Sequence, residues 1–203
     1  PFPTAAAING AALGGGLELA MHCDGVIAAP PPSKDGQPGK PYAVGLPEAG
    51  LGLCPGWGGT NLLPARMDPA EAIRRTAAGK PMQFDEAVAA GVFDRVAPDA
   101  GKLIATAMAW LAEQKQGARE RDGAPRKWIG RSVCAAGVFS AVSEIKAECA
   151  ATESGAAVCK AVEAGLSAGW ESAIAVERRE LVRLRHTPAA KQSLGAFFSK
   201  AKK

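Results

Sequence analysis

The stretch AAINGAALGGGLELAMHCD, residues 6–24, carries the clearest fold signal in the chain. The apolar run from Thr4 to Ile8 predicts a strand, and the triplet Gly14 to Gly16 predicts a turn into a helix that begins near Leu17. Because glycine lacks a side chain, backbone N–H groups at such a helix start can approach a ligand closely and favour negative charge. The triplet is therefore either an oxyanion-binding loop or a turn that permits tight packing of strand and helix.

Two glutamates lie in apolar surroundings that are unusual for a carboxylate. Glu18 falls in the first turn of the predicted helix, between Leu17 and Leu19. Glu48 follows Leu46-Pro47 and lies shortly before the glycine-rich run GLGLCPGWGGT. A carboxylate in apolar company usually has a partner or a chemical task. The alternatives are that Glu18 is a charge favourable to the helix dipole and that Glu48 is an exposed loop acid.

Short strands, turns and helices alternate in the first half of the chain, which predicts an α/β fold. Val26 to Ala29 is the next predicted strand, and PPPSKDGQPGKP, residues 30–41, is a predicted surface loop. Asp68 before Pro69 predicts the start of a helix, and Gly79 predicts its end. Further elements are expected at residues 85–91 (helix), 92–96 (extended) and 102–116 (helix).

The second half of the chain has a helical pattern from Arg131 to its end. The segment RERDGAPRK, residues 119–127, is the linker candidate. It divides a glycine-rich α/β part, residues 1–118, from an all-helical part, residues 119–203. Breaks in the helical pattern are expected at Gly155, at residues 165–169 and at Thr187-Pro188.

Composition excludes several classes of protein. A chain of 203 residues, 47% hydrophobic and 22% charged, is typical of one globular domain. The net charge of +4 is small and the Lys and Arg residues are scattered along the chain, so a nucleic-acid partner is not indicated. No apolar run reaches the roughly 18 residues of a membrane span. The five cysteines form no CxxC pair, so neither a disulfide framework nor a metal site is indicated, and a reducing cytoplasm is expected.

Three blocks in this order resemble the signature segments of the crotonase superfamily, the enoyl-CoA hydratases and isomerases. They are residues 6–24, LPEAGLGLCPGWGGTNLLPAR (46–66) and AAGKPMQFDEAVAAGVFDRVAP (77–98). The resemblance implies the carboxyl-terminal part of a ClpP/crotonase-like ββα-superhelix fold, followed by a helical region. Residues 171–200 resemble the end of the hydratase part of multifunctional fatty acid oxidation alpha subunits, where a 3-hydroxyacyl-CoA dehydrogenase domain follows. The family's amino-terminal half does not precede Pro1, so a fragment is expected.

The resemblance implies roles for particular residues. Gly15 matches the N–H donor that binds the thioester oxygen as it becomes an enolate. Glu18 and Glu48 match the two catalytic glutamates, with Glu18 assigned mainly to the water and Glu48 to the proton at the α-carbon. No metal ligand is implied. The candidate substrate-binding residues are Gly14, Gly16, Leu17, Pro47, Pro55, Gly56 and Trp57.

The implied reaction is the syn addition of water to trans-2-enoyl-CoA, which gives 3-hydroxyacyl-CoA in fatty acid β-oxidation. The alternatives are an enoyl-CoA delta isomerase and a catalytically silent scaffold piece. The segment needs no cofactor of its own, because the acyl-CoA substrate carries coenzyme A, and NAD would enter only with a dehydrogenase domain. A homo-oligomer or a multifunctional complex is expected, with weak activity as an isolated fragment. His22 is expected to be a packed or hydrogen-bonded side chain.

Overall fold

The computed structural model describes residues 2–33, 37, 39–114 and 122–200. Two small sheets form its centre. The first has the order β1 (Ala5–Ile8), β3 (Gly25–Ala28) and β6 (Arg95–Val96), all parallel. The second has the order β2 (Ala12–Leu13), β4 (Ala43–Gly45) and β5 (Met82–Gln83), with β2 parallel and β5 antiparallel to β4. The mixed α/β class expected from the sequence is confirmed.

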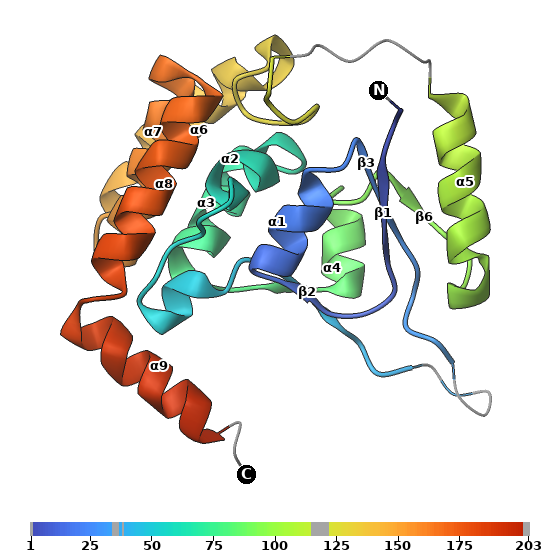
Figure 1. Ribbon diagram of the computed structural model, residues 1–203, viewed down its shortest axis with the longest axis horizontal. Helices are drawn as coiled ribbons and strands as arrows, with labels where there is room; N and C mark the ends of the chain where they lie inside the picture. The colour runs from blue at the N-terminus through green and yellow to red at the C-terminus, as the bar shows by residue number, and fades with distance from the viewer. Residues whose placement is uncertain (1, 34–36, 38, 115–121, 201–203) are drawn as a thin grey trace.

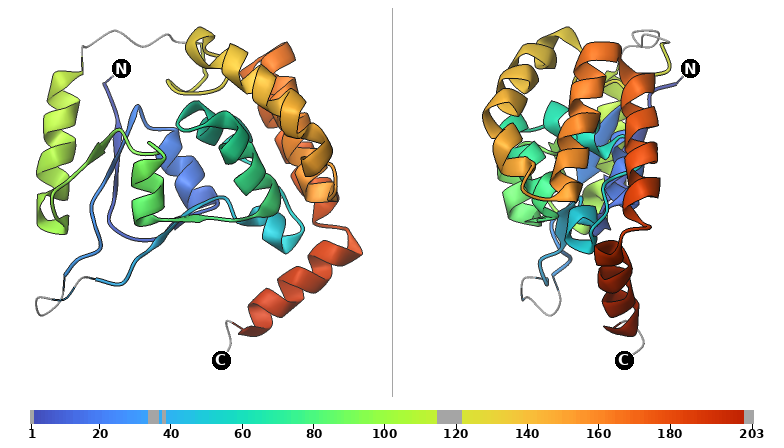
Figure 2. Two further views of the ribbon diagram at one scale, coloured as in Figure 1. Left: turned by 180° about the vertical axis from the view of Figure 1, so that it is seen from behind. Right: turned by 90° about the vertical axis from the view of Figure 1, so that its left-hand side faces the viewer.

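Helices cover the sheets on two sides (Figure 1). The helix α5 packs on the first sheet, and α6, α7 and α8 form a helical layer that contacts α2 and α3. Figure 2 shows α9 extending away from this layer. No described helix combines the length and the apolar character needed to cross a bilayer. The helices are α1 (Gly15–Met21), η1 (Glu48–Leu51), α2 (Gly59–Leu62), η2 (Leu63–Ala65), α3 (Pro69–Ala78), α4 (Phe84–Ala89), η3 (Ala100–Lys102), α5 (Leu103–Glu113), α6 (Ser132–Cys149), α7 (Glu153–Ala168), α8 (Trp170–Leu184) and α9 (Pro188–Lys200).

The hydrophobic core consists of two clusters. The larger one joins α1, both sheets, α3 and the layer α6–α8. The smaller one lies between the first sheet and α5, where Ile27 packs with Leu103 and Trp110. A Cβ atom on Gly25 would lie 2.5 Å from the Trp110 ring, so glycine permits this close contact between strand and helix.

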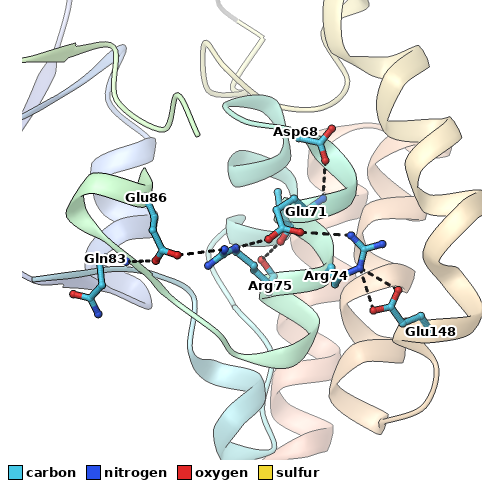
Figure 3. Close-up of polar contacts among 9 residues, drawn as sticks. Asp68, Glu71, Arg74, Arg75, Gln83, Glu86 and Glu148 are labelled. Atoms are coloured by element: carbon cyan, nitrogen blue, oxygen red, sulfur yellow. Dashed lines mark hydrogen bonds and ion pairs between the residues drawn. The ribbon is translucent and has the colours of Figure 1, made fainter. Parts of the chain in front are cut away.

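The helix α3 begins and ends where its sequence signals predict. The Asp68 side chain accepts a hydrogen bond from the Glu71 N–H group at 2.9 Å, and Gly79 has φ +64. Its polar face then carries a chain of ion pairs, in which Arg75 binds Glu71 and Arg74 binds Glu148 of α6 (Figure 3). These contacts join α3 to the helical layer on the solvent side.

The helix break expected at Gly155 is wrong, and the break expected over residues 165–169 falls at the last of them, Gly169. Gly155 and Gly165 both lie inside α7, which runs without interruption to Ala168. A Cβ atom on Gly155 would collide with the Cys149 carbonyl, and one on Gly165 would collide with the Asn61 side chain. These glycines therefore permit close packing rather than end a helix. Helices do end before Thr152 and at Gly169, and the break at Thr187-Pro188 is confirmed.

Some sequence expectations fall on residues outside the description. In the surface loop 30–41, residues 34–36 and 38 lie outside it, and so do residues 119–121 of the linker candidate. The described part of that linker is anchored, because Asp122 pairs with Arg131 at 2.6 Å. On the other side of the linker, α5 is described to its end at Glu113.

Candidate functional site

The glycine triplet forms the turn between β2 and α1. Gly14 has φ +55 and donates to the Gly45 carbonyl at 2.9 Å, while its own carbonyl accepts from the N–H groups of Leu17 and Glu18. Gly15 is the first residue of α1, and its N–H group has no acceptor among the described residues. A Cβ atom on Gly15 or Gly16 would meet nothing within 4 Å. The backbone at this turn is therefore open to a ligand.

The carboxylate of Glu18 is buried and held by backbone donors. Its side chain is 3% exposed, and Oε1 accepts from the N–H groups of Trp57 and Gly59, each at 2.8 Å. Burial raises the pKa of Glu18, and these donors and the nearby His22 oppose the rise. The His22 ring in turn bonds the Trp57 carbonyl at 2.8 Å, as expected for a hydrogen-bonded histidine. The apolar surroundings of Glu18 thus include specific hydrogen-bond donors that stabilise its charge.

Glu48 lies on the other side of the glycine turn. It is the first residue of η1, and its Oε1 is 2.5 Å from the point where a Cβ on Gly14 would stand. Its Oε2 is buried without a hydrogen-bond partner among the described residues. Burial, followed by the charges of Glu18 and Glu177, raises the pKa of Glu48 to about 7. Glu48 therefore lies against Gly14, at the start of the helix that carries Glu18, and the two acids are close enough for their charges to interact.

The other predicted site residues differ in their accessibility. Gly14, Leu17, Pro55 and Gly56 are buried, and Leu17 belongs to the main core. Gly15 and Gly16 are exposed at the turn, and Pro47 is the N-cap of η1. Trp57 is 57% exposed, and together with His22 and Trp170 it borders a pocket of about 360 Å³ beside α1 and α8. Trp57 is thus a pocket wall close to the Glu18 carboxylate.

A third buried carboxylate was not found by sequence reasoning. Glu177 of α8 is fully buried and accepts hydrogen bonds from the N–H groups of Gly58 and Thr60. Burial and the charge of Glu18 raise the pKa of Glu177 to about 7. Its signal is a position in the apolar stripe of α8, three residues after Ile174 and four before Leu181. The neighbouring arginines of α8 obscured this stripe in the sequence.

A second pocket, of about 370 Å³, lies between α3 and α6, away from the two acids. Its walls include Arg74 and Arg75, which could attract an anion. Both are already paired, Arg74 with Glu148 and Arg75 with Glu71, as Figure 3 shows. Because the charges of both arginines are already balanced, this pocket is a poor anion site. The glycine turn with its two acids is therefore the candidate active site.

The arrangement of sheets and helices is the crotonase fold. The solved structures that it matches include an enoyl-CoA hydratase/isomerase from Pseudoalteromonas atlantica T6c, at a TM-score of 0.58 and 22% identity, over 98% of this chain and 62% of that one. A carnitinyl-CoA hydratase from Mycobacterium avium matches at a TM-score of 0.57 and 29% identity, over 98% of this chain and 60% of that one. The chain thus spans about three fifths of the length of these structures.

The sequence assigns the chain to a protein family more specifically than the fold does. Residues 1–121 match the family described as "Enoyl-CoA hydratase/isomerase", which is more than half of the 203 residues. The chain belongs to the enoyl-CoA hydratase/isomerase family. The glycine turn, Glu18 and Glu48 all lie within the matched residues.

The buried acids predict an unusual dependence of stability on pH. Glu48 and Glu177 have pKa values near 7 in the folded chain and near 4.5 when unfolded, so the folded chain binds more protons between these values. The free energy of unfolding should therefore fall as the pH rises from about 5 to about 8. Carboxyl groups that are paired with cations, such as Asp94 and Glu180, have lowered pKa values. They stabilise the folded chain fully once the pH exceeds their unfolded pKa values, so they do not change its stability within this window.

Urea denaturation at several pH values measures this decline. Glu48→Gln should make it shallower, because one of the two titrating groups is then removed. A free energy of unfolding that is constant or rises across the window would contradict the assignment of two acids with raised pKa values.

Proposed function

We propose that this chain hydrates trans-2-enoyl-CoA to 3-hydroxyacyl-CoA. The observation that carries the proposal is the placement of the buried Glu18 and the half-buried Glu48 beside a glycine turn, where the Gly15 N–H group has no acceptor among the described residues. Addition of water to a conjugated thioester needs one group that takes a proton from water and one that gives a proton to the α-carbon. It also needs a donor for the oxygen that becomes negative.

The environments of the two acids support different tasks. Burial raises the pKa of Glu18, but the two N–H donors on Oε1 oppose this rise and favour the ionised form, which is the form that can take a proton from water. The pKa of Glu48 is raised to about 7, so this group holds a proton near neutral pH and can donate it. Water then adds to the β-carbon, its proton goes to Glu18, and the proton of Glu48 goes to the α-carbon. Exchange with solvent restores both acids.

The Gly15 N–H group serves the developing enolate oxygen in this proposal. It is the one donor at the turn that we assign to this oxygen. Loss of one such donor costs roughly 100- to 1,000-fold in rate, so this N–H group should contribute strongly to turnover.

An assay in oxygen-18 water separates the candidate reactions. With a four-carbon trans-2-enoyl-CoA, hydration should give 3-hydroxyacyl-CoA that carries one oxygen-18 atom at the β-carbon, as seen by mass spectrometry. A 3-enoyl-CoA that moves its double bond without incorporating oxygen-18 would instead support the isomerase. Binding of both thioesters without turnover would support the silent scaffold and contradict hydration.

The acyl group of the substrate is a further question for the same assay. The matched solved structures include a carnitinyl-CoA hydratase, at 29% identity. Carnitinyl-CoA is therefore a substrate to test in the direction of water loss. Faster turnover of carnitinyl-CoA than of the unsubstituted hydroxyacyl-CoA would define the acyl specificity.

We further infer that the chain works within a multifunctional subunit or a homo-oligomer in the cytoplasm. The resemblance of residues 171–200 to fatty acid oxidation alpha subunits supports the first point. None of the five cysteines forms a disulfide in the described part of the chain, which suits a reducing compartment. In this organisation residues 1–118 supply both acids, residues 119–203 form the helical region, and NAD enters only through an attached dehydrogenase domain.

A further inference from the structure

Four consecutive backbone N–H groups alternate between two buried carboxylates. Those of Trp57 and Gly59 bind Oε1 of Glu18, each at 2.8 Å. Those of Gly58 and Thr60 bind Oε2 and Oε1 of Glu177, at 2.5 and 2.9 Å. The loop 57–60 is therefore held from both sides, by α1 through Glu18 and by α8 through Glu177.

Among the described residues, the hydrogen bonds of the Glu177 carboxylate all go to this loop. Its Oε1 also accepts from the Thr60 hydroxyl group at 2.5 Å, and that hydroxyl accepts from the Asn61 amide at 2.9 Å. No lysine or arginine pairs with Glu177 among residues 2–33, 37, 39–114 and 122–200. Glu180, one turn further on α8, is also buried but pairs with Lys160 and Arg183. Glu177 is thus an uncompensated buried carboxylate that is dedicated to one loop.

An ionised carboxylate without a cation is costly to bury, and an apolar residue would pack more favourably at this point. The cost is offset by three hydrogen bonds to one short segment. Helix α8 also approaches this segment closely, because a Cβ on Gly58 would collide with Trp170 and would stand 3.2 Å from Ile174. Gly58 itself has φ +98, a backbone angle that glycine adopts readily.

We propose that Glu177 is a positioning residue of the site: it fixes the loop 57–60 so that the N–H groups of Trp57 and Gly59 orient the Glu18 carboxylate. This inference rests on the proposed function, which gives Glu18 the task of activating water. Glu177 does not touch the substrate in this arrangement and acts through the loop. A third carboxylate from the helical layer thereby becomes part of the catalytic apparatus.

Glu177 also acts on Glu48 through its charge. Its negative charge is one of the causes that raise the pKa of Glu48, after burial and the charge of Glu18. Removal of this charge should therefore lower the pKa of Glu48. The titratable groups that interact directly with Glu177 are Glu18, Glu48 and Cys54. Glu180 of α8 pairs with Lys160 of α7 and Arg183 of α8. His22 of α1 contacts the ring of Trp170, at the start of α8.

The test compares Glu177→Gln with Glu180→Gln. Both remove a buried charge from α8, but only the first removes an acceptor of the loop. In Glu177→Gln, kcat for hydration should fall, by up to roughly 100-fold for a displaced catalytic group. The alkaline limb of its pH profile should move to lower pH, because Glu48 then loses its proton earlier. Glu180→Gln should keep the wild-type pH profile even where it unfolds more easily.

Thr60 supplies a milder pair of variants in case Glu177→Gln does not fold. Thr60→Val removes the hydroxyl donor to Glu177, whereas Thr60→Ser keeps it. We expect the alkaline limb to shift in Thr60→Val, in the same direction as in Glu177→Gln, and to stay unchanged in Thr60→Ser. Equal pH profiles in all four variants would overturn the inference.

A carbon-13 titration of the glutamate side chains makes the test independent of turnover. NMR spectra of the wild type and of each variant would follow the carboxyl with the pKa near 7 that disappears in Glu48→Gln. A lower pKa of this group in Glu177→Gln supports the inference, and an unchanged one overturns it. If the wild type hydrates no enoyl-CoA, the proposed function fails, but this titration still decides whether Glu177 acts on Glu48.

Discussion

Glu48→Gln should reduce kcat for hydration by roughly 100- to 10,000-fold, the usual contribution of a general acid or base. Glutamine fills the same space but has no proton to give to the α-carbon. The KM should change little, because the thioester is held by other groups. The part of the alkaline limb near pH 7 that comes from Glu48 should vanish, although Glu177 still titrates in this range.

The same variant should be more stable than the wild type at pH 8, where the half-buried Glu48 is ionised and costly. Loss of activity together with gain of stability separates a chemical defect from unfolding. Glu144→Gln, at an exposed position on α6, is the matched control and should leave kcat unchanged. Near-wild-type turnover in Glu48→Gln would remove the two-glutamate mechanism.

Gly14→Ala should impair both stability and activity. Its φ of +55 is unfavourable for alanine, which costs roughly 1–3 kcal/mol. The new methyl group would also lie 2.5 Å from Oε1 of Glu48, so the carboxyl must move. A displacement of about 1 Å at a reacting group can reduce kcat by roughly 100-fold.

Gly91→Ala separates these two effects. Gly91 has a similar backbone angle, φ +80, but its Cβ would meet only the Arg66 carbonyl, at 3.6 Å. It should therefore lose stability like Gly14→Ala while keeping its kcat. Denaturant melts and hydration rates of the two variants measure both quantities. If the kcat of Gly14→Ala equals that of Gly91→Ala, Gly14 does not position Glu48.

Local signals in the sequence predicted the parts of the fold that local interactions determine. The helix α3 carries its cap at Asp68 and its stop at Gly79 in the sequence, and both function as predicted. Glu18 and Glu48 could be chosen because each stands in an apolar, glycine-rich segment. The structure adds that Glu48 lies against Gly14, at the start of the helix that carries Glu18, which a separation of 30 residues in the sequence does not indicate.

Features that depend on distant contacts were missed or misinterpreted. Glu177 binds a loop that is 117 residues away at Thr60, and nothing near it in the sequence indicates that loop. Gly155 and Gly165 were interpreted as helix breaks because glycine weakens helices. Glycine is needed at these positions because other segments approach α7 closely there, and this is visible only when α7 is packed against its neighbours.

The alternating donors of the loop 57–60 also bear on how this chain can be recombined. The sequence changes character at residues 119–127, which makes that segment attractive as a crossover point for chimeras. A helical region taken from another protein would have to bring an acceptor to the place of Glu177, or the N–H groups of Gly58 and Thr60 would be buried without partners. The sequences of the two parts are therefore coupled through the Glu177 side chain. The helical region must keep an acceptor at this position to remain compatible with the part that carries the two acids.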